Sequence, residues 1–304
     1  MGSHLHTEEV DLVLKLALGT VQFGLAYGVA NKVGQVNREE VKQILQLARS
    51  AGIDTLDTAI AYGQSEQVLG ELGVSEFKVV TKLPGIPEGI SNLEDWVEDQ
   101  LFASRRRLGL SSVHAVLLHR SEDLLGADGS RLAQALNQLK LRGCVEKVGV
   151  SIYDPIELDL VTQVMAIDLV QAPLNLLDRR LEMSGWLRRL HDQGVEVHTR
   201  SAFLQGLLLL PRSQIPDQFE RWSTLWDTWH STLSDLNTTA TTACLSYPSS
   251  LPEVDRVVVG VDNIRQLQQI IQASLQVTKE IHQTFTSLRC NDSRLINPSN
   301  WNTL

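Results

Sequence analysis

The fold is predicted from the stretch D-T-L-D-T-A-I-A-Y-G-Q-S-E, residues 54–66, in which a short strand leads into a polar turn and then into a helix. Successive side chains of a strand point to opposite faces, so the Asp57 side chain is expected to lie on one defined side of the sheet. Tyr62 follows in the turn, and Ser65 is suited to cap the helix that begins at Glu66. An acid where a strand ends, with a phenol in the next loop, is typical of the active face of a barrel enzyme.

Two later strands also lead to chemically active side chains. Residues 77–81 (F-K-V-V-T) form a β-branched run followed by Lys82, and residues 113–118 (V-H-A-V-L-L) are followed by His119. A helical pattern separates each strand from the next, and the carboxyl ends of parallel strands meet on one face of a barrel. We therefore expect a single group on that face, made of Asp57, Tyr62, Lys82 and His119.

The alternation of strand and helix patterns continues along the chain. Besides the strand that holds Asp57, strands are expected at 16–19, 77–81, 113–118, 147–151, 168–172, 196–201 and 256–260. The last of these is a continuous valine run, which is typical of a parallel sheet buried on both faces. Eight strand and helix pairs predict an α/β fold of the (β/α)₈ TIM barrel type. We expect one domain over residues 1–304, with the barrel proper at about 14–285.

Two local signals refine this prediction near the N-terminus. The tetrapeptide N-R-E-E at residues 37–40 predicts a capping box, in which Asn37 and Glu40 each bond the other's backbone N–H at the start of the first helix. A loose alternation over residues 10–17 predicts a short hairpin that closes the lower end of the barrel.

Two segments lie outside the repeat. Residues 206–242 predict an extra helix near 220–233, between the seventh and eighth strands. Trp222, Trp226 and Trp229 form a stripe on this helix, which either packs the helix onto the barrel or forms a wall of the substrate pocket. The C-terminal tail after Phe285 is polar and is expected to be mobile or laid over a loop.

Composition limits the partners of the chain. It has 304 residues, 43% hydrophobic content, a formal net charge of −9 and no run of Lys or Arg, which argues against nucleic acid or an anionic membrane as a partner. No apolar run approaches the roughly 18 residues of a membrane helix. Residues 1–6 resemble a tag remnant rather than a signal peptide, so a cytoplasmic location is expected. Widely spaced cysteines and the lack of tight His and carboxylate spacing predict no metal site.

Four stretches together resemble the aldo-keto reductase family: residues 18–24 (L-G-T-V-Q-F-G), 57–70 (D-T-A-I-A-Y-G-Q-S-E-Q-V-L-G), 80–84 (V-T-K-L-P) and 117–120 (L-L-H-R). The resemblance implies an NAD(P)H-dependent enzyme that reduces a small aldehyde or ketone, including a sugar or sugar derivative, to the alcohol. It also implies that Asp57, Tyr62, Lys82 and His119 are catalytic.

The chain must hold a nucleotide without a Rossmann turn, because no G-x-G-x-x-G follows any strand. In barrels the phosphate lies at the loops after strands seven and eight, which here are residues 200–206 and 260–263. The resemblance implies that Ser151 and Gln171 bind the carboxamide and that Arg200 lies against the nicotinamide ring. The full set of expected cofactor residues is Gly19, Thr20, Val21, Asp57, Ser151, Gln171, Arg200, Ser201, Phe203, Leu204, Gly206, Gly260, Asp262, Asn263, Arg265 and Gln266.

Three positions depart from the common family pattern. Ile152 stands where many relatives have Asn, and Arg200 stands where many have an aromatic ring. Asp262 occupies a position where relatives that bind a 2′-phosphate often have Arg or Lys, although Arg265 one turn later could substitute for it. The resemblance nevertheless favours NADP(H) over NAD(H).

The expected chemistry assigns one role to each residue of the group. Tyr62 donates the proton, the Lys82 ammonium makes the phenol more acidic, and a neutral His119 orients the carbonyl. Asp57 keeps the lysine charged and in position. Taken singly, each of these residues has an ordinary structural explanation, and the argument for chemistry rests on their joint placement at successive strands.

Two other functional classes remain open from sequence. One is a cofactor-binding sensor or regulatory subunit of the same fold with little turnover. The other is an unrelated barrel lyase or isomerase, which would bind no nicotinamide. The physiological substrate, the reaction direction and the oligomeric state are left open.

Overall fold

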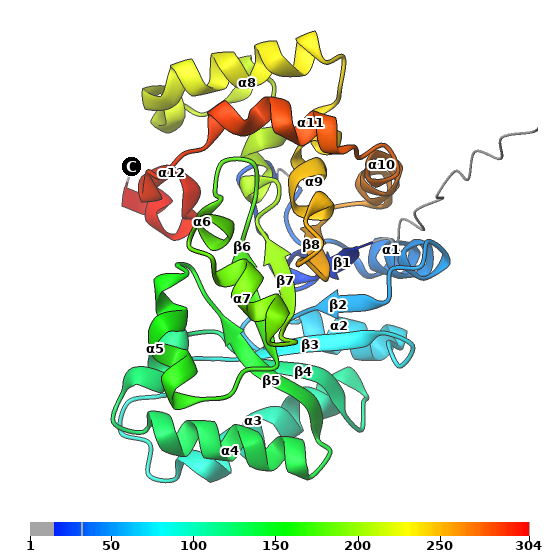
Figure 1. Ribbon diagram of the computed structural model, residues 1–304. Coiled ribbons are helices and arrows are strands. Elements are labelled where there is room, and N and C mark those ends of the chain that lie inside the picture. The colour runs from blue at the N-terminus through cyan, green and yellow to red at the C-terminus, as the bar shows by residue number, and fades with distance from the viewer. Residues whose placement is uncertain (1–14, 32, 304) are drawn as a thin grey trace, which may run out of the picture.

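A closed parallel barrel forms the centre of the molecule in the computed structural model, which describes residues 15–31 and 33–303 (Figure 1). Each strand pairs with the next in sequence order, and the eighth pairs with the first. The strands are β1 Leu16–Gly19, β2 Thr55–Asp57, β3 Lys78–Leu83, β4 Val113–Leu118, β5 Val145–Ser151, β6 Leu169–Pro173, β7 Glu196–Arg200 and β8 Arg256–Gly260. The predicted TIM barrel is therefore confirmed.

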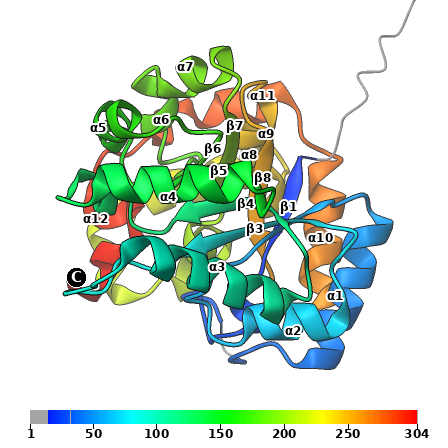
Figure 2. The same ribbon diagram turned by 90° about the horizontal axis from the view of Figure 1, so that it is seen from below.

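Helices surround the barrel, as the view from below shows (Figure 2). Those that follow successive strands are α1 Arg38–Ser50, α2 Ser65–Leu72, α3 Leu93–Leu108, α4 Gly129–Leu141, α5 Ile156–Val164, α6 Arg180–Met183, α7 Trp186–Asp192 and α10 Ile264–Ser274. Between β7 and β8 lie α8 Ser223–Asp235 and α9 Ala240–Ser250, and the chain continues after α10 with α11 Lys279–Thr284 and α12 Ser293–Ile296. Among the described residues, no helix is long and apolar enough to cross a bilayer.

The strand register brings the predicted side chains to one end of the barrel. Gly19 at the end of β1 pairs with Asp57 on one side and with Gly260 on the other. Ser151 at the end of β5 pairs with Gln171 of β6. Because all strands run in the same direction, these residues share the carboxyl face of the barrel.

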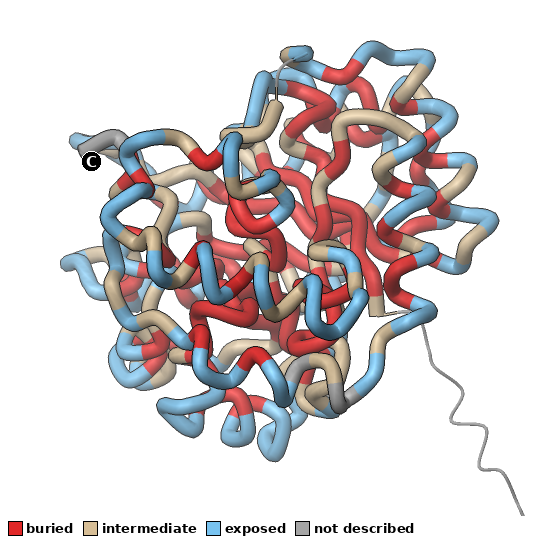
Figure 3. Tube along the Cα trace, turned by 90° about the horizontal axis from the view of Figure 1, so that it is seen from above, coloured by how far each residue is buried: buried red, intermediate tan, exposed pale blue. Residues whose placement is uncertain are grey.

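The core consists of two clusters of buried residues, and Figure 3 shows buried residues at the centre of the molecule. Val80, Ala115, Leu117 and Leu169 form a small cluster of their own, and a much larger cluster joins strand and helix residues. Each fully buried Leu or Val contributes about 1.5–3 kcal/mol relative to exposure, so these clusters supply the main driving force for folding.

Of two predicted helix caps, one is half formed and the other is wrong. The Asn37 side chain accepts from the Glu40 backbone N–H at 3.0 Å, but the Glu40 carboxylate accepts from the backbone N–H of Ile264 in α10, so the capping box is half formed. Ser65 does not cap α2, which has Gln64 at its N-cap and already includes Ser65. The Ser65 hydroxyl instead lies 2.9 Å from the carbonyl of Thr20, which ties α2 to the end of β1.

The extra helix is confirmed as α8, and Trp226 and Trp229 pack inward from it, whereas Trp222 precedes the helix and is half-buried. Trp226 donates to the Phe219 carbonyl at 2.8 Å, and Trp229 donates to the Leu208 carbonyl at 3.2 Å. Neither ring lines the large cavity described below, so packing is the role that the structure supports for this stripe. Figure 1 shows α8 on the outside of the molecule, beside α11.

The second helix of this segment, α9, is not predicted from sequence. It contains Pro248, and all residues from Thr242 to Pro248 are buried. A helix buried on every side shows no alternation of polar and apolar faces, so the periodic signal is absent.

The tail is packed rather than mobile. Leu295 and Ile296 are fully buried, and Trp301 meets the ring of Phe219 edge-on with centroids 4.8 Å apart. Most of the hairpin expected over residues 10–17 lies outside the described residues.

Candidate active site

A cavity of about 650 Å³ opens at the carboxyl ends of the strands. It is lined by loops that follow β1, β2, β4, β5, β7 and β8. Of the predicted site residues, those on its wall are Gly19, Thr20, Val21, Asp57, Tyr62, His119, Ser151, Gln171, Arg200, Ser201, Phe203, Gly206, Gly260, Asp262 and Gln266. Lys82 lies beneath the wall and is almost fully buried, whereas Leu204, Asn263 and Arg265 do not line the cavity.

A buried ion pair forms the floor of the cavity. Lys82, the penultimate residue of β3, donates to Asp57 Oδ1 at 2.7 Å and to the Thr58 carbonyl at 2.9 Å. Gln171 from β6 also donates to Asp57 Oδ1, at 2.6 Å. Burial lowers the pKa of Lys82, and the attraction of Asp57 opposes that shift. Residues of β2, β3 and β6 therefore hold the pair, and the opposite charges of Lys82 and Asp57 neutralise each other.

Tyr62 and His119 lie together above this pair. The Lys82 Nζ is 5.1 Å from the centroid of the Tyr62 ring, and the His119 ring meets Tyr62 edge-on with centroids 5.9 Å apart. The backbone N–H of Ile60 donates to the Lys82 carbonyl at 3.2 Å, which anchors the turn that carries Tyr62 over the strand ends. The four residues that the sequence placed in one group therefore do meet.

The acid and base properties of the group differ partly from expectation. Burial, and next the negative charge of Asp57, raises the pKa of Tyr62 well above that of a free phenol, while Arg200 opposes the shift. The expected effect of the lysine on the acidity of the phenol stays a prediction, because the net direction is set by burial and Asp57. Burial and the Lys82 charge lower the pKa of His119 to about 4, so its imidazole is neutral at pH 7, as expected.

The loop after β7 has a strained backbone where phosphate binding was expected. Ser201, Leu204 and Gln205 have φ angles of 63°, 48° and 53°, in the left-handed region that non-glycine residues rarely adopt. Strain of this kind costs about 1–3 kcal/mol at each such residue and is concentrated at functional sites. Gly206, with φ 88°, completes the turn, and a Cβ there would lie 2.8 Å from Ala30.

Residues 15–289 match the aldo/keto reductase family. The chain belongs to the aldo-keto reductase family. The reductase is 28% identical over 219 residues to the oxidoreductase sirO of Leptosphaeria maculans, a match that covers 69% of this chain and 65% of sirO.

One further relative and one solved structure are similar to this chain. The NADH-specific methylglyoxal reductase of Escherichia coli (strain K12) is 27% identical over 235 residues, which cover 70% of this chain and 71% of that protein. The holo form of aldo-keto reductase AKR11C1 from Bacillus halodurans matches with a TM-score of 0.74 at 20% identity, over 94% of this chain and 95% of that one, and so has the same fold. Membership of the family supports an NAD(P)H-dependent oxidoreductase.

The cavity of the reductase fits the extended dinucleotide that the family implies. Gln22, on the wall beside β1, is buried, and its Oε1 has no hydrogen-bond partner among the described residues. A Cβ on Gly260 would lie 2.4 Å from the Gln22 Nε2, so only glycine leaves this space open. An acceptor without a partner beside bare backbone suits a polar ligand. Sequence reasoning missed Gln22, although its position directly after Gly19-Thr20-Val21 could have indicated it.

Asp262 and Arg265 are arranged differently from the expected phosphate site. The Asp262 carboxylate accepts from the Asn31 amide at 2.9 Å and from the Gln266 amide at 3.4 Å, and burial raises its pKa. Arg265 is exposed and lies outside the cavity wall. The expectation that Arg265 could replace a basic residue at position 262 is therefore not met in this geometry.

Gln171 and Arg200, which were expected to contact the carboxamide and the nicotinamide ring, each have a partner within the protein. One N–H of the Gln171 side-chain amide donates to Asp57, which leaves the second N–H and the carbonyl oxygen for a ligand. The Arg200 guanidinium stacks on the ring of Tyr153, with 4.4 Å between Cζ and the centroid. Tyr153 and Asn31 line the cavity and were missed, because their loops carry no periodic signal. Phe23 is fully buried in the core and does not line the cavity.

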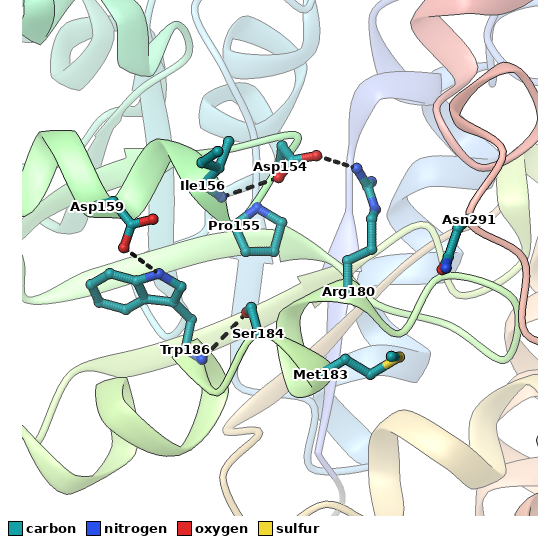
Figure 4. Close-up of a pocket in the computed structure, with 9 residues that line it drawn as sticks. All are labelled: Asp154, Pro155, Ile156, Asp159, Arg180, Met183, Ser184, Trp186 and Asn291. Atoms are coloured by element: carbon teal, nitrogen blue, oxygen red, sulfur yellow. Dashed lines mark hydrogen bonds and ion pairs between the residues drawn. The ribbon is translucent and has the colours of Figure 1, made fainter.

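A second hollow, of about 500 Å³, lies beside α5 and α6 (Figure 4). It contains none of the catalytic candidates. Its charged residue Arg180 is paired with Asp154 at 2.6 Å and with Asp178 at 2.8 Å, and the Trp186 indole donates to Asp159. Since these polar groups already bond one another, this hollow is a poor candidate for the reaction site. Within the described residues no cluster of His, Cys, Asp or Glu could hold a metal ion.

Proposed function

We propose that this protein reduces a small aldehyde or ketone to the alcohol with a nicotinamide cofactor, and that Tyr62 is the proton donor. The observation that carries the proposal is the buried Lys82–Asp57 pair, with Nζ and Oδ1 2.7 Å apart, directly beneath Tyr62 and beside a neutral His119. The same arrangement run backwards would oxidise an alcohol.

The cofactor would supply the hydride, and the protein would manage the charge that develops on the carbonyl oxygen. Tyr62 is protonated at neutral pH, because burial and Asp57 raise its pKa, so its hydroxyl can donate a hydrogen bond and then the proton. A neutral His119 can donate a second hydrogen bond and orient the oxygen. The tyrosinate that remains would be stabilised by Lys82 below it and by Arg200.

The charges around the cavity favour NAD(H) as the preferred cofactor, in contrast to the NADP(H) that the family resemblance favours. Asp262 is on the cavity wall and would repel a 2′-phosphate, whereas Arg265 is exposed and does not line the cavity. One relative is named as NADH-specific, which is in keeping with this preference. We therefore propose NAD(H) over NADP(H) for this chain.

The test measures cofactor oxidation across a panel of aldehydes and ketones with the wild type and with Tyr62→Phe. We expect turnover by the wild type and a fall of about 10²- to 10⁴-fold in kcat/KM for the variant, because a phenyl ring cannot donate a proton. Cofactor affinity, measured by the quenching of tryptophan fluorescence, should change little. Tight cofactor binding with no turnover on any carbonyl would contradict the proposal and favour a sensor or regulatory protein.

A further inference from the structure

Arg200 is a cation at the end of the cavity near Tyr62 and His119, and it has no acidic partner among the described residues. Arg200, the last residue of β7, is partly exposed on the cavity wall. It donates to the Ile152 carbonyl at 2.9 Å and to the Ser201 hydroxyl at 3.4 Å, neither of which carries a charge. No carboxylate within residues 15–31 and 33–303 forms an ion pair with this guanidinium, so its charge is not neutralised by the part of the chain that the structure describes.

The other charges near the reaction centre are already compensated. Asp57 is paired with Lys82, His119 is neutral, and Tyr62 is protonated. Arg200 is close enough to this group to lower the pKa of both Tyr62 and His119. The reaction end of the cavity therefore carries a net positive charge, although the protein as a whole has a formal net charge of −9.

The guanidinium is also held in a fixed orientation. Its Cζ lies over the ring of Tyr153, 4.4 Å from the centroid, and the Ile152 carbonyl accepts from one of its N–H groups. The two hydrogen bonds use two of the five N–H groups that an arginine offers. An arginine fixed in this way is suited to paired hydrogen bonds with a carboxylate or a phosphate.

We infer that Arg200 determines substrate specificity by binding an anionic substituent, a carboxylate or a phosphate, on the carbonyl compound that is reduced. This inference rests on the proposed function and names a substrate class for the same site. It differs from the role that the family resemblance implies, in which Arg200 lies against the nicotinamide ring, since here the N–H edge of the guanidinium binds the ligand while Tyr153 covers one of its two faces.

The experiment compares matched substrates that differ by one anionic group: succinic semialdehyde with butanal, and glyceraldehyde 3-phosphate with glyceraldehyde. For the wild type we expect kcat/KM to be higher for the anionic member of at least one pair, and the pair that shows it identifies carboxylate or phosphate as the group recognised. In Arg200→Gln this preference should fall by about 10- to 100-fold, because a charge-assisted hydrogen bond is lost. Arg200→Lys should keep an intermediate preference, since it retains charge without the planar fork.

Lys42→Gln is the matched control, because it removes an exposed cation of α1, away from the cavity wall, and should leave the preference unchanged. The inference is overturned if the wild type shows no preference for either anion, or if Arg200→Gln lowers kcat/KM equally for charged and neutral substrates and weakens NADH binding to the same extent. That second result would place Arg200 on the cofactor. Failure to oxidise NAD(P)H with any carbonyl would instead contradict the proposed function itself.

Discussion

At the scale of single residues, one carboxylate on the cavity wall bears on cofactor choice. Asp262 accepts hydrogen bonds from the amides of Asn31 and Gln266 rather than from a cation, and under the proposed function its charge would repel a 2′-phosphate. Replacing Asp262 with Asn removes the charge and keeps nearly the same shape. We expect the ratio of kcat/KM for NADH over NADPH to fall by at least about 10-fold, because like charges in contact cost more than 1 kcal/mol.

Steady-state kinetics with both cofactors and one aldehyde measure this ratio. Arg265→Gln is a useful companion, since an exposed residue outside the cavity should leave the ratio nearly unchanged. A loss of NADPH activity in Arg265→Gln, with no effect in Asp262→Asn, would show that the arginine governs the choice and would contradict our proposal.

Glu66 in the same motif as Tyr62 has a structural role rather than a catalytic one. It is 2% exposed, accepts from the hydroxyls of Thr81 and Ser104 at 2.7 and 2.6 Å, and pairs with Arg107 at 2.6 Å. We expect Glu66→Ala to lower the free energy of unfolding by about 3–5 kcal/mol, because three partners lose a buried charge. Urea unfolding measures the loss, and KM for the cofactor at a permissive temperature should stay near the wild-type value. A stability change below about 1 kcal/mol would be incompatible with this role.

At the scale of elements, the loop after β7 has a strained backbone on the cavity wall, so a substitution in this loop is expected to affect ligand binding. Gly206 has φ 88°, and a Cβ there would lie 2.8 Å from the Cβ of Ala30 in the loop after β1. We expect Gly206→Ala to shift these two loops apart and to weaken NADH binding by about 10-fold, on the order of 1–2 kcal/mol of strain and displaced contacts.

Gly194→Ala is the matched control for this prediction. Gly194 has a similar φ of 73° but no neighbouring atom within 4 Å, and it lies between α7 and β7, off the cavity wall. It should lower stability by about 1 kcal/mol through backbone strain alone and leave cofactor affinity intact. If both variants weaken NADH binding equally, the effect comes from general destabilisation and not from the loop.

At the scale of the whole molecule, an ionic cluster joins the amino ends of β4, β5 and β7. Glu196 is hydrogen-bonded to His114 at 3.1 Å, to His198 at 2.7 Å and to Lys147. Burial raises the pKa of Glu196, but these three partners outweigh burial and hold it well below its usual range. The hydrogen bond with Glu196 raises the pKa of His114.

Because of this cluster, the free energy of unfolding should fall both when the pH is lowered and when it is raised. A carboxylate with a depressed pKa adds stability above its unfolded pKa of about 4.3, and this is lost as the pH falls. A histidine with a raised pKa adds stability that is complete below about 6.5 and is lost as the pH rises through its folded value. We expect Glu196→Gln to cost about 3 kcal/mol near pH 5–6, with a smaller cost at pH 3 and at pH 9. Urea unfolding of wild type and variant across this range measures the difference. A cost that does not vary with pH would mean that packing, not charge, explains the effect.

The order of strands and helices was predictable because it depends on local patterns. Alternation with a period of two, runs of β-branched residues and turn residues mark β1 to β8, and the helices between them show a period of 3.6. The grouping of Asp57, Tyr62, Lys82 and His119 followed from topology, since parallel strands in sequence order deliver their carboxyl ends to one face. The helix α9 was not predicted, because it is buried on all sides and therefore shows no alternation of polar and apolar faces.

The sequence by itself thus determined the barrel, the family resemblance and the four residues at its mouth, all of which follow from spacing along the chain. Only the tertiary structure decided which partner each polar atom takes. It placed the Gln171 amide on Asp57, the Arg200 guanidinium on Tyr153 and the Gln22 side chain beside Gly260. The physical reason is that a hydrogen bond or a ring contact depends on atoms brought within a few ångströms from residues as far apart as 22 and 260, and no local pattern encodes that distance.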